Sequence, residues 1–112
     1  MTTAKRGDLI TVALQGDLGK PRPAIVIQSD YLITHSVLVC PPTSTAVDEP
    51  LYRLPIVPTP GNGLRVESYV MVEKISAIPR WKVGEVLGRI DDAQLVALNR
   101  MLAEITGLFD DA

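Results

Sequence analysis

Apolar residues over the first ninety positions of the chain fall into short runs, and most of these runs end at Pro or Gly. Short runs that are rich in Val and Ile are typical of β-strands. We therefore predict strands at residues 8–14, 24–28, 36–40, 51–57 and 66–73, and a shorter one at 86–90. Residues 78–81 read Ile-Pro-Arg-Trp and predict one turn of helix between strands.

The last segment of the chain has helical spacing instead. Its apolar residues recur at intervals of three and four, at Leu95, Leu98, Met101, Leu102, Ile105 and Leu108. Asp91 can cap this helix, Gln94 completes a capping-box pattern, and Gly107 is a suitable stop. We expect the apolar stripe to pack on the sheet, and a contact with the helix of a second copy is the alternative.

A strand-rich body followed by one long helix predicts a mainly β fold with a C-terminal α-helix, arranged as a small, partly open antiparallel barrel. A chain of 112 residues has room for one core, so residues 1–112 are expected to form a single domain. No apolar run approaches the ~18 residues of a membrane helix. The opening stretch MTTAKRGDL has no apolar signal core. We therefore expect a cytoplasmic protein with no membrane partner.

Cysteine, histidine and charge narrow the possible chemistry further. Cys40 and His35 are the only residues of their types, so neither an internal disulfide nor a zinc site is expected. Residues 91–112 contain one basic and five acidic residues, a net charge of −4, whereas residues 1–90 carry a net charge of +2. The strand-rich body is therefore compatible with RNA, although it lacks a strongly basic footprint.

Arg22 stands between Pro21 and Pro23, immediately before the β-branched run AIVI. Proline fixes its own φ and disfavours helix in the residue before it, so Arg22 is expected to be extended where a loop becomes a strand. A cation on a stiffened backbone at that place suits an anion. An ordinary turn arginine is the alternative interpretation.

The order of segments around Arg22 is distinctive. RGDLITVAL (6–14) is followed by the loop QGDLGK (15–20), then by PRPAIVIQSD (21–30), SVLVC (36–40) and PPTST (41–45). Together with the C-terminal stretch 88–108, this order resembles the MazF/PemK family of bacterial toxins, which are ribosome-independent endoribonucleases. The resemblance covers roughly residues 6–108, and it implies the partly open barrel that the family shares with the gyrase poison CcdB.

The resemblance also implies an activity and partners. Members of the family are homodimers that cut single-stranded RNA, chiefly mRNA, at selected sequences and leave a cyclic phosphate and a 5′-hydroxyl. They need no metal or cofactor. A separate antitoxin neutralises them by laying an extended, acidic segment over the RNA groove.

Two residues match the active-site positions of the family. Arg22 matches the arginine before the proline of the second strand, and Thr43 matches the threonine in the turn after the third strand. An ST-turn that satisfies backbone groups is the alternative role for Thr43. The candidate RNA contacts are Lys20, Ser44, Thr45, Arg65, Glu73 and Arg80, with Arg53 and Lys82 as further basic candidates.

The chain also departs from the family pattern. Some members carry a histidine in the loop before the Arg-Pro pair, and the loop at 15–20 has none. Some carry Arg-x-Asp in the fifth strand, where this chain has Met71-Val72-Glu73. The general base and acid are therefore not identified. Glu73 could act as the base, but we expect instead that it forms an ion pair with Lys74 or Arg65.

Three other reactive residues are expected to be structural. His35 lies in a turn where the resemblance supplies no active-site residue, and Cys40 ends an apolar strand without a histidine beside it in the sequence. Trp81 stands between two basic residues and could stack a base, but we expect it to anchor its helical turn to the core.

Two other functions remain open at this point. A gyrase poison of the CcdB type depends on a C-terminal Trp-Gly-Ile, and this chain ends in LFDDA instead. A family member that binds RNA or an antitoxin without cutting is compatible with the missing loop histidine and with Met71.

Overall fold

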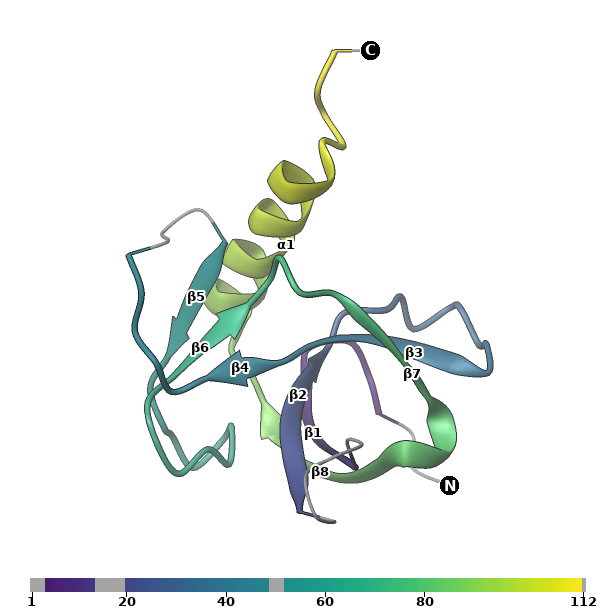
Figure 1. Cartoon of the computed structure of the whole chain (residues 1–112), viewed down its shortest axis with the longest axis vertical. Helices are drawn as coiled ribbons and strands as arrows, with labels where there is room; N and C mark the ends of the chain where they lie inside the picture. The colour runs from purple at the N-terminus through teal and green to yellow at the C-terminus, as the bar shows by residue number, and fades with distance from the viewer. Residues whose placement is uncertain (1–3, 14–19, 49–51, 112) are drawn as a thin grey trace.

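A computed structural model describes residues 4–13, 20–48 and 52–111, in which the strands form two antiparallel sheets (Figure 1). The larger sheet has the strand order β7-β3-β2-β1-β8. Its strands are β1 (Asp8–Ala13), β2 (Pro21–Val26), β3 (Ser36–Cys40), β7 (Ser76–Pro79) and β8 (Val83–Arg89). The smaller sheet has the order β4-β6-β5. It contains β4 (Pro42–Thr43), β5 (Arg53–Ile56) and β6 (Ser68–Met71).

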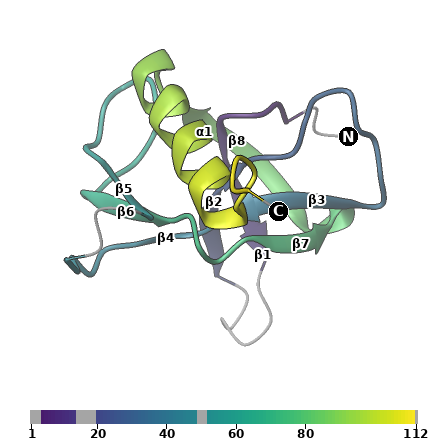
Figure 2. The same ribbon diagram turned by 90° about the horizontal axis from the view of Figure 1, so that it is seen from above.

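The two sheets share one stretch of chain. Only Pro41 separates β3 from β4, so one extended segment pairs with β2 and β7 at its start and with β6 at its end. The carbonyl of Pro41 accepts a hydrogen bond from the backbone N–H of Met71 at 2.9 Å. The sheets curve toward each other without closing, as Figure 2 shows from above. This confirms the predicted mainly β fold and its partly open barrel.

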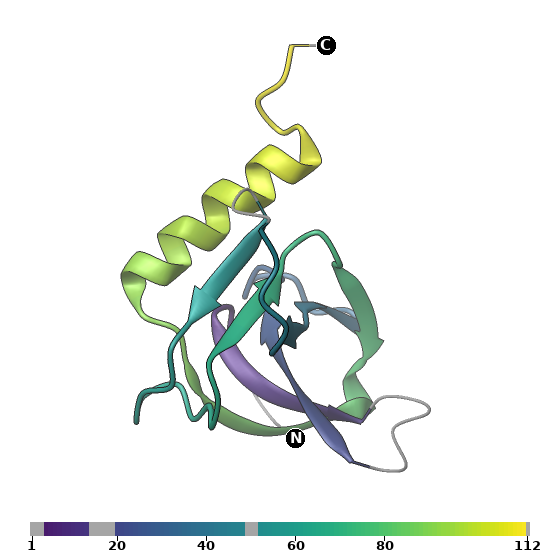
Figure 3. The same cartoon turned by 60° about the vertical axis from the view of Figure 1, so that its left-hand side comes forward.

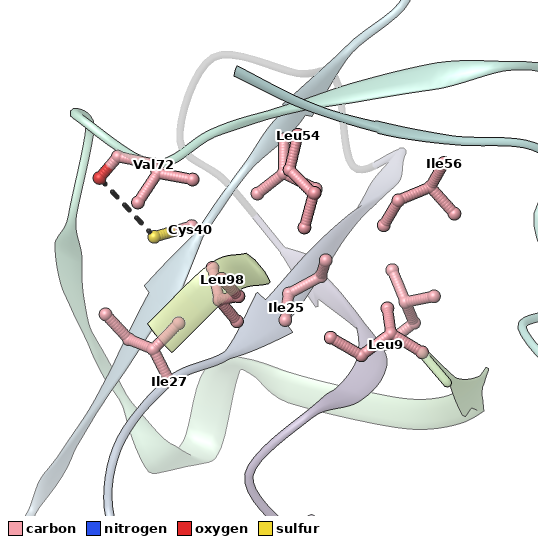
Figure 4. Packing of buried hydrophobic residues seen from close by; sticks show 10 residues of the cluster. Leu9, Ile25, Ile27, Cys40, Leu54, Ile56, Val72 and Leu98 are labelled. Carbon is pink, nitrogen blue, oxygen red and sulfur yellow. Dashed lines mark hydrogen bonds between the residues drawn. The ribbon is translucent and has the colours of Figure 1, made fainter. Parts of the chain in front are cut away.

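The larger sheet is buried on both faces at its centre. One face and the smaller sheet enclose the main core (Figure 4), which consists of Leu9, Ile25, Ile27, Cys40, Leu54, Ile56, Val70, Val72, Ile90 and Leu98. The opposite face carries a second cluster of Ile10, Val12, Ala24, Val26, Val37, Val39 and Ile78. Because neighbouring residues of β2 point to opposite faces, burial on both sides explains its unbroken apolar run.

The helix α1 (Asp92–Thr106) lies beside β5 and runs along one side of the smaller sheet (Figure 3). Its start is the predicted capping box, in which the Asp91 carboxylate accepts from the Gln94 N–H at 2.7 Å and the Gln94 side chain accepts from the Asp91 N–H at 2.9 Å. Gly107 ends the helix with a φ of +67°. Leu98 is fully buried in the core, while Leu95, Met101, Leu102 and Ile105 are only half-buried. The stripe from Leu95 to Ile105 therefore packs on the sheet, as expected, whereas Leu108 lies beyond the end of the helix and is exposed. No helix in the described part of the chain is long and apolar enough to cross a membrane.

Several boundaries differ from the sequence-based prediction. The strands β4 and β7 were not predicted. The two residues of β4 are too few to show a periodic pattern, and the sequence of β7, Ser-Ala-Ile-Pro, does not alternate between polar and apolar residues. The predicted helical turn at 78–81 was wrong at its start, since Ile78 and Pro79 belong to β7 and the 3₁₀ turn η1 spans Arg80–Lys82. A proline is tolerated there because β7 is an edge strand.

The remaining strands begin or end at other residues than predicted. The second strand begins at Pro21 rather than at residue 24, and the last begins at Val83 rather than at residue 86. The sixth strand, β6, covers Ser68–Met71 of the predicted 66–73. Residues 14 and 51, at the ends of two predicted strands, lie outside the described residues.

The capping box gives a direct test of the helix. Replacing Asp91→Ala removes the acceptor for the Gln94 N–H, so we expect the free energy of unfolding to fall by about 1 kcal/mol in urea titrations. Asp92→Ala is the matched control, because it removes a first-turn acid without the cap and should change stability by only about 0.3 kcal/mol. Equal effects of the two substitutions would contradict the cap.

Candidate active site

The two residues matched to the family's active site lie on neighbouring segments where the sheets join. In the register of β2 against β3, Ile25 lies opposite Cys40. Beyond this pair the chain passes through Pro41 into β4, which belongs to the smaller sheet, and β2 contacts β4. Arg22 is exposed and Thr43 is half-buried. The fold thus brings the strands that carry Arg22 and Thr43, 21 positions apart in the sequence, next to each other.

The local sequence explains why Arg22 is extended. Pro21 and Pro23 are both residues of β2, and they pair with Ala13 and Thr11 of β1. Neither proline can donate to a sheet ladder, and both restrict the backbone on either side of Arg22. Lys20, also exposed, directly precedes this strand.

Thr43 forms the ST-turn that was considered as its alternative role. Its Oγ1 accepts a hydrogen bond from the backbone N–H of Thr45 at 3.2 Å. A hydroxyl that accepts one hydrogen bond still has its own hydrogen to donate, so this turn orients the group without using its donor. Ser44 and Thr45 follow it and are both exposed.

Tyr69 is a residue near Thr43 that the sequence did not reveal. It lies directly opposite Thr43 in the register of β4 against β6. Side chains of directly opposed residues lie on the same face of a sheet. The Tyr69 hydroxyl donates to Glu67 at 3.3 Å. The charge of Glu67, some burial and this hydrogen bond raise the pKa of Tyr69 above its ordinary value, so the phenol keeps its proton at neutral pH. The sequence signal was the Glu-x-Tyr spacing, which places both side chains on one face of a strand.

Glu73 lies further along the smaller sheet and is paired with Arg53. The Arg53 guanidinium donates to the two carboxylate oxygens, with Nε–Oε1 at 3.1 Å and Nη2–Oε2 at 2.6 Å. The expected alternative partners, Lys74 and Arg65, were wrong. Arg53 lies opposite Met71, the last residue of β6, and Glu73 lies in the turn that follows, within reach of the Arg53 side chain.

This ion pair weakens Glu73 as a base. Burial alone would raise the pKa of Glu73, but the hydrogen bonds and charge of Arg53, a backbone hydrogen bond and the charge of Lys74 lower it overall. A carboxylate with a lowered pKa is ionised at neutral pH but accepts a proton less readily.

Arg80 and Arg65 differ in their position relative to Thr43. Ser36 pairs with Pro79, so Arg80 lies at the start of β3, whereas Thr43 follows the end of that strand. The Nε of Arg80 donates to the carbonyl of Thr34. Arg65 is exposed in the segment that leads into β6, the strand opposite Thr43. The structure therefore does not bring Arg80 together with Arg22 and Thr43.

Cys40, His35 and Trp81 were expected to have structural roles, and the structure agrees for Cys40 but not for Trp81. Cys40 is fully buried and its thiol donates to the carbonyl of Val72 at 3.8 Å (Figure 4). Burial and the charge of Glu73 raise the pKa of Cys40 to about 12. Its complete burial confirms the expectation that Cys40 is a core residue. His35 is exposed just before β3. The expectation for Trp81 was wrong, because its side chain is 80% exposed. Across residues 4–13, 20–48 and 52–111, no three His, Cys, Asp or Glu side chains gather into a possible metal site.

Comparison with known proteins identifies the family. Residues 5–106 match the family model described as the PemK-like, MazF-like toxin of type II toxin–antitoxin systems. The chain belongs to this family. A curated relative from Mycolicibacterium smegmatis, named as a probable endoribonuclease MazF, is 39% identical over 106 residues, which cover 93% of this chain and 97% of that protein.

Solved structures show the same fold at lower identity. An endoribonuclease from a mycobacterial species, solved in complex with its cognate antitoxin, has a TM-score of 0.75 and 21% identity, and the match covers 94% of this chain and 96% of that one. A MazE–MazF complex from Deinococcus radiodurans has a TM-score of 0.77 and 21% identity, with 96% and 98% covered.

The Arg53–Glu73 pair of this MazF-like toxin predicts a pH-dependent coupling. A double-mutant cycle with Arg53→Ala and Glu73→Ala should give a coupling of about 1 kcal/mol at neutral pH in urea unfolding. The folded-state pKa of Glu73 is lowered, so this stabilisation is present above the ordinary glutamate pKa of about 4.3 and is lost as the pH falls through the folded-state value. The same cycle between Arg65 and Glu73 is the control and should show no coupling. A coupling with Arg53 that persists unchanged in acid would contradict the ion pair.

The state of Cys40 predicts its reactivity. A maleimide dye should label the folded protein far more slowly than the urea-unfolded protein, because the buried thiol stays protonated. Labelling is read by mass spectrometry, and a Cys40→Ala variant controls for reaction at amines. Equal labelling rates in the two states would show that the thiol is accessible.

Proposed function

We propose that this MazF-like toxin is a sequence-selective endoribonuclease that cuts single-stranded RNA, chiefly mRNA, with Arg22 and Thr43 at the scissile phosphate. The observation that supports the proposal is the contact between β2, which carries Arg22, and β4, which carries Thr43. The endoribonuclease name of the curated relative supports the same reaction class.

The proposed cleavage uses the RNA's own 2′-OH as the nucleophile. The 2′-oxygen attacks the adjacent phosphorus while the bond from phosphorus to the 5′-oxygen breaks, which yields a 2′,3′-cyclic phosphate and a 5′-hydroxyl. One group removes the 2′-OH proton, and another donates a proton to the leaving oxygen. Arg22 binds the non-bridging oxygens through its planar fork and stabilises the added charge of the phosphorane. Thr43 donates its hydroxyl hydrogen to the same phosphate.

Tyr69 is our candidate for the proton donor. Its hydroxyl is protonated at neutral pH, and the residue lies opposite Thr43 on the same face of the sheet. Arg22 is a poor base because its pKa lies far above neutrality. Lys20, Ser44, Thr45 and Arg65 are proposed to contact the flanking phosphates and bases, whereas Glu73 and Arg80 lie further from Thr43.

The proposal extends to partners and place of action. We infer that residues 1–112 act as one domain in the cytoplasm, as a homodimer, without a metal or cofactor. A cognate antitoxin is proposed to cover the surface around Arg22 with an extended, acidic segment that matches the charge of RNA. Structural relatives solved with their antitoxins support such a partner.

A member that binds RNA without cutting it is the second candidate. Two observations favour it, since Met71 occupies the position of the family's strand arginine and Glu73 is held by Arg53 rather than being available as a base. The two candidates differ in one measurable property, the cleavage of RNA.

Cleavage of a long, mixed-sequence single-stranded RNA in excess EDTA, with the cut ends mapped, separates these functions. The wild-type protein should give discrete cuts at one recurring sequence. Arg22→Ala should lower the rate by about 10²–10³-fold, because it removes a charged donor to the phosphorane. Thr43→Val and Tyr69→Phe should each lower the rate by about tenfold or more.

The matched control is Arg100→Ala, which removes an exposed arginine on α1 and should cut like the wild type. No cutting by folded wild-type protein on several RNAs would support the binding function instead. Equal cutting by wild type and Arg22→Ala would place the active site elsewhere.

A further inference from the structure

A separate cavity of about 470 Å³ opens near the β7 edge of the larger sheet. Its lining is mainly aliphatic and comes from Val26, Leu32, Ile33, Val37 and Val83, with Trp81 beside them. Neither Arg22 nor Thr43 lines it. Ile33 and Trp81 are 85% and 80% exposed, so the apolar surface continues out of the cavity onto the protein surface. A surface of this kind marks an interaction site.

The rim of this cavity is positively charged. Lys5 and Arg80 line it, and the Nζ of Lys82 lies 5.4 Å from the centre of the Trp81 ring. Asp30 is the acidic residue of the lining, and its carboxylate accepts the backbone N–H of Arg6 at 2.7 Å. Among the residues that the structure describes, Lys5, Arg80 and Lys82 form no ion pair. The cavity therefore suits an apolar group that is followed by negative charge.

The buried polar group of the cavity favours an apolar side chain over a nucleobase. Gln28 is only 6% exposed, and its Nε2 donates to the Leu32 carbonyl at 2.7 Å and to Thr34 Oγ1 at 3.3 Å. Its Oε1 accepts the Leu38 N–H at 3.1 Å. With these bonds formed, the amide is not available to read the edge of a base.

The C-terminal segment of the same chain has the complementary chemistry. After the helix stop at Gly107, Leu108 and Phe109 are 69% and 83% exposed, and Asp110 and Asp111 follow them. Neither aspartate forms an ion pair within the described ranges 4–13, 20–48 and 52–111. Figure 1 shows this segment projecting from the top of the molecule, while the turn after β7 lies at the lower right. The segment therefore does not occupy the cavity of its own chain.

We propose that residues 108–111 of one copy dock into this cavity of a second copy. Phe109 enters the aliphatic cavity beside Trp81, and the two aspartates face Lys5, Arg80 and Lys82. In a pair of copies related by a two-fold axis, each segment would dock into the cavity of the other copy, which closes the pair.

Trp81 is the only tryptophan of the chain, so its fluorescence reports directly on the cavity. In a dilution series of the wild-type protein, the emission should shift to longer wavelength as the docked segment leaves and Trp81 becomes hydrated. Phe109→Ser should raise the apparent dissociation constant of this transition at least about tenfold, because it removes the central apolar anchor. Val96→Ser, which changes an exposed apolar residue on α1, should behave as the wild type. Circular dichroism checks that all variants are folded.

Adding the segment in trans completes the test. A peptide with the sequence of residues 106–111 should shift the emission of the Phe109→Ser protein to shorter wavelength, and the peptide carrying serine at the Phe109 position should not. Lys5→Glu in the protein should weaken this response. Emission that does not depend on concentration, on Phe109 or on the peptide would overturn the proposal. A response to single-stranded RNA but not to the peptide would overturn it in favour of a nucleotide subsite. None of these readouts requires RNA cleavage.

Discussion

The candidate site depends on one continuous strand that belongs to both sheets. Because only Pro41 separates β3 from β4, the register of β3 with β2 is carried directly into the pairing of β4 with β6. That continuity brings Thr43 opposite Tyr69 on β6 and leads β4 past β2, the strand that carries Arg22. The apolar core beneath it, which includes Cys40, Val70 and Leu98, packs the two sheets together. The proposed site residues therefore lie on strands that are held by pairing and by packing.

The sequence was sufficient to predict those elements whose signals lie within a few neighbouring residues. The Asp91–Gln94 box and Gly107 specify both ends of α1, because caps are made by residues three or four apart. The β-branched run of β2 predicts a strand that is buried on both faces. By contrast, β4 consists of two residues and exists only because β6 pairs with it, so no period in its own sequence could have revealed it.

The contacts of the site were predictable only in part, for the same reason. The resemblance pointed to Arg22 and Thr43 from neighbouring motifs, and the strands that carry them are in contact. The partner of Glu73 and the position of Tyr69 depend on which residues lie opposite each other in the smaller sheet. Trp81 was expected in the core on the basis of its size, but the turn η1 directs it outward beside Lys82. The register between strands determines which side chains lie opposite each other. That register cannot be derived from a single sequence.

The environment of Cys40 has a consequence for control of the toxin. The only thiol of the chain is buried and kept protonated by its surroundings, including the nearby carboxylate of Glu73. Oxidants and disulfides react with thiolates, so the Cys40 thiol of the folded protein is a poor target for peroxide and for disulfide exchange. Oxidation of this thiol is therefore not expected to switch the folded toxin off. Restraint by a bound antitoxin, as in the relatives solved with theirs, would not depend on the redox state of Cys40.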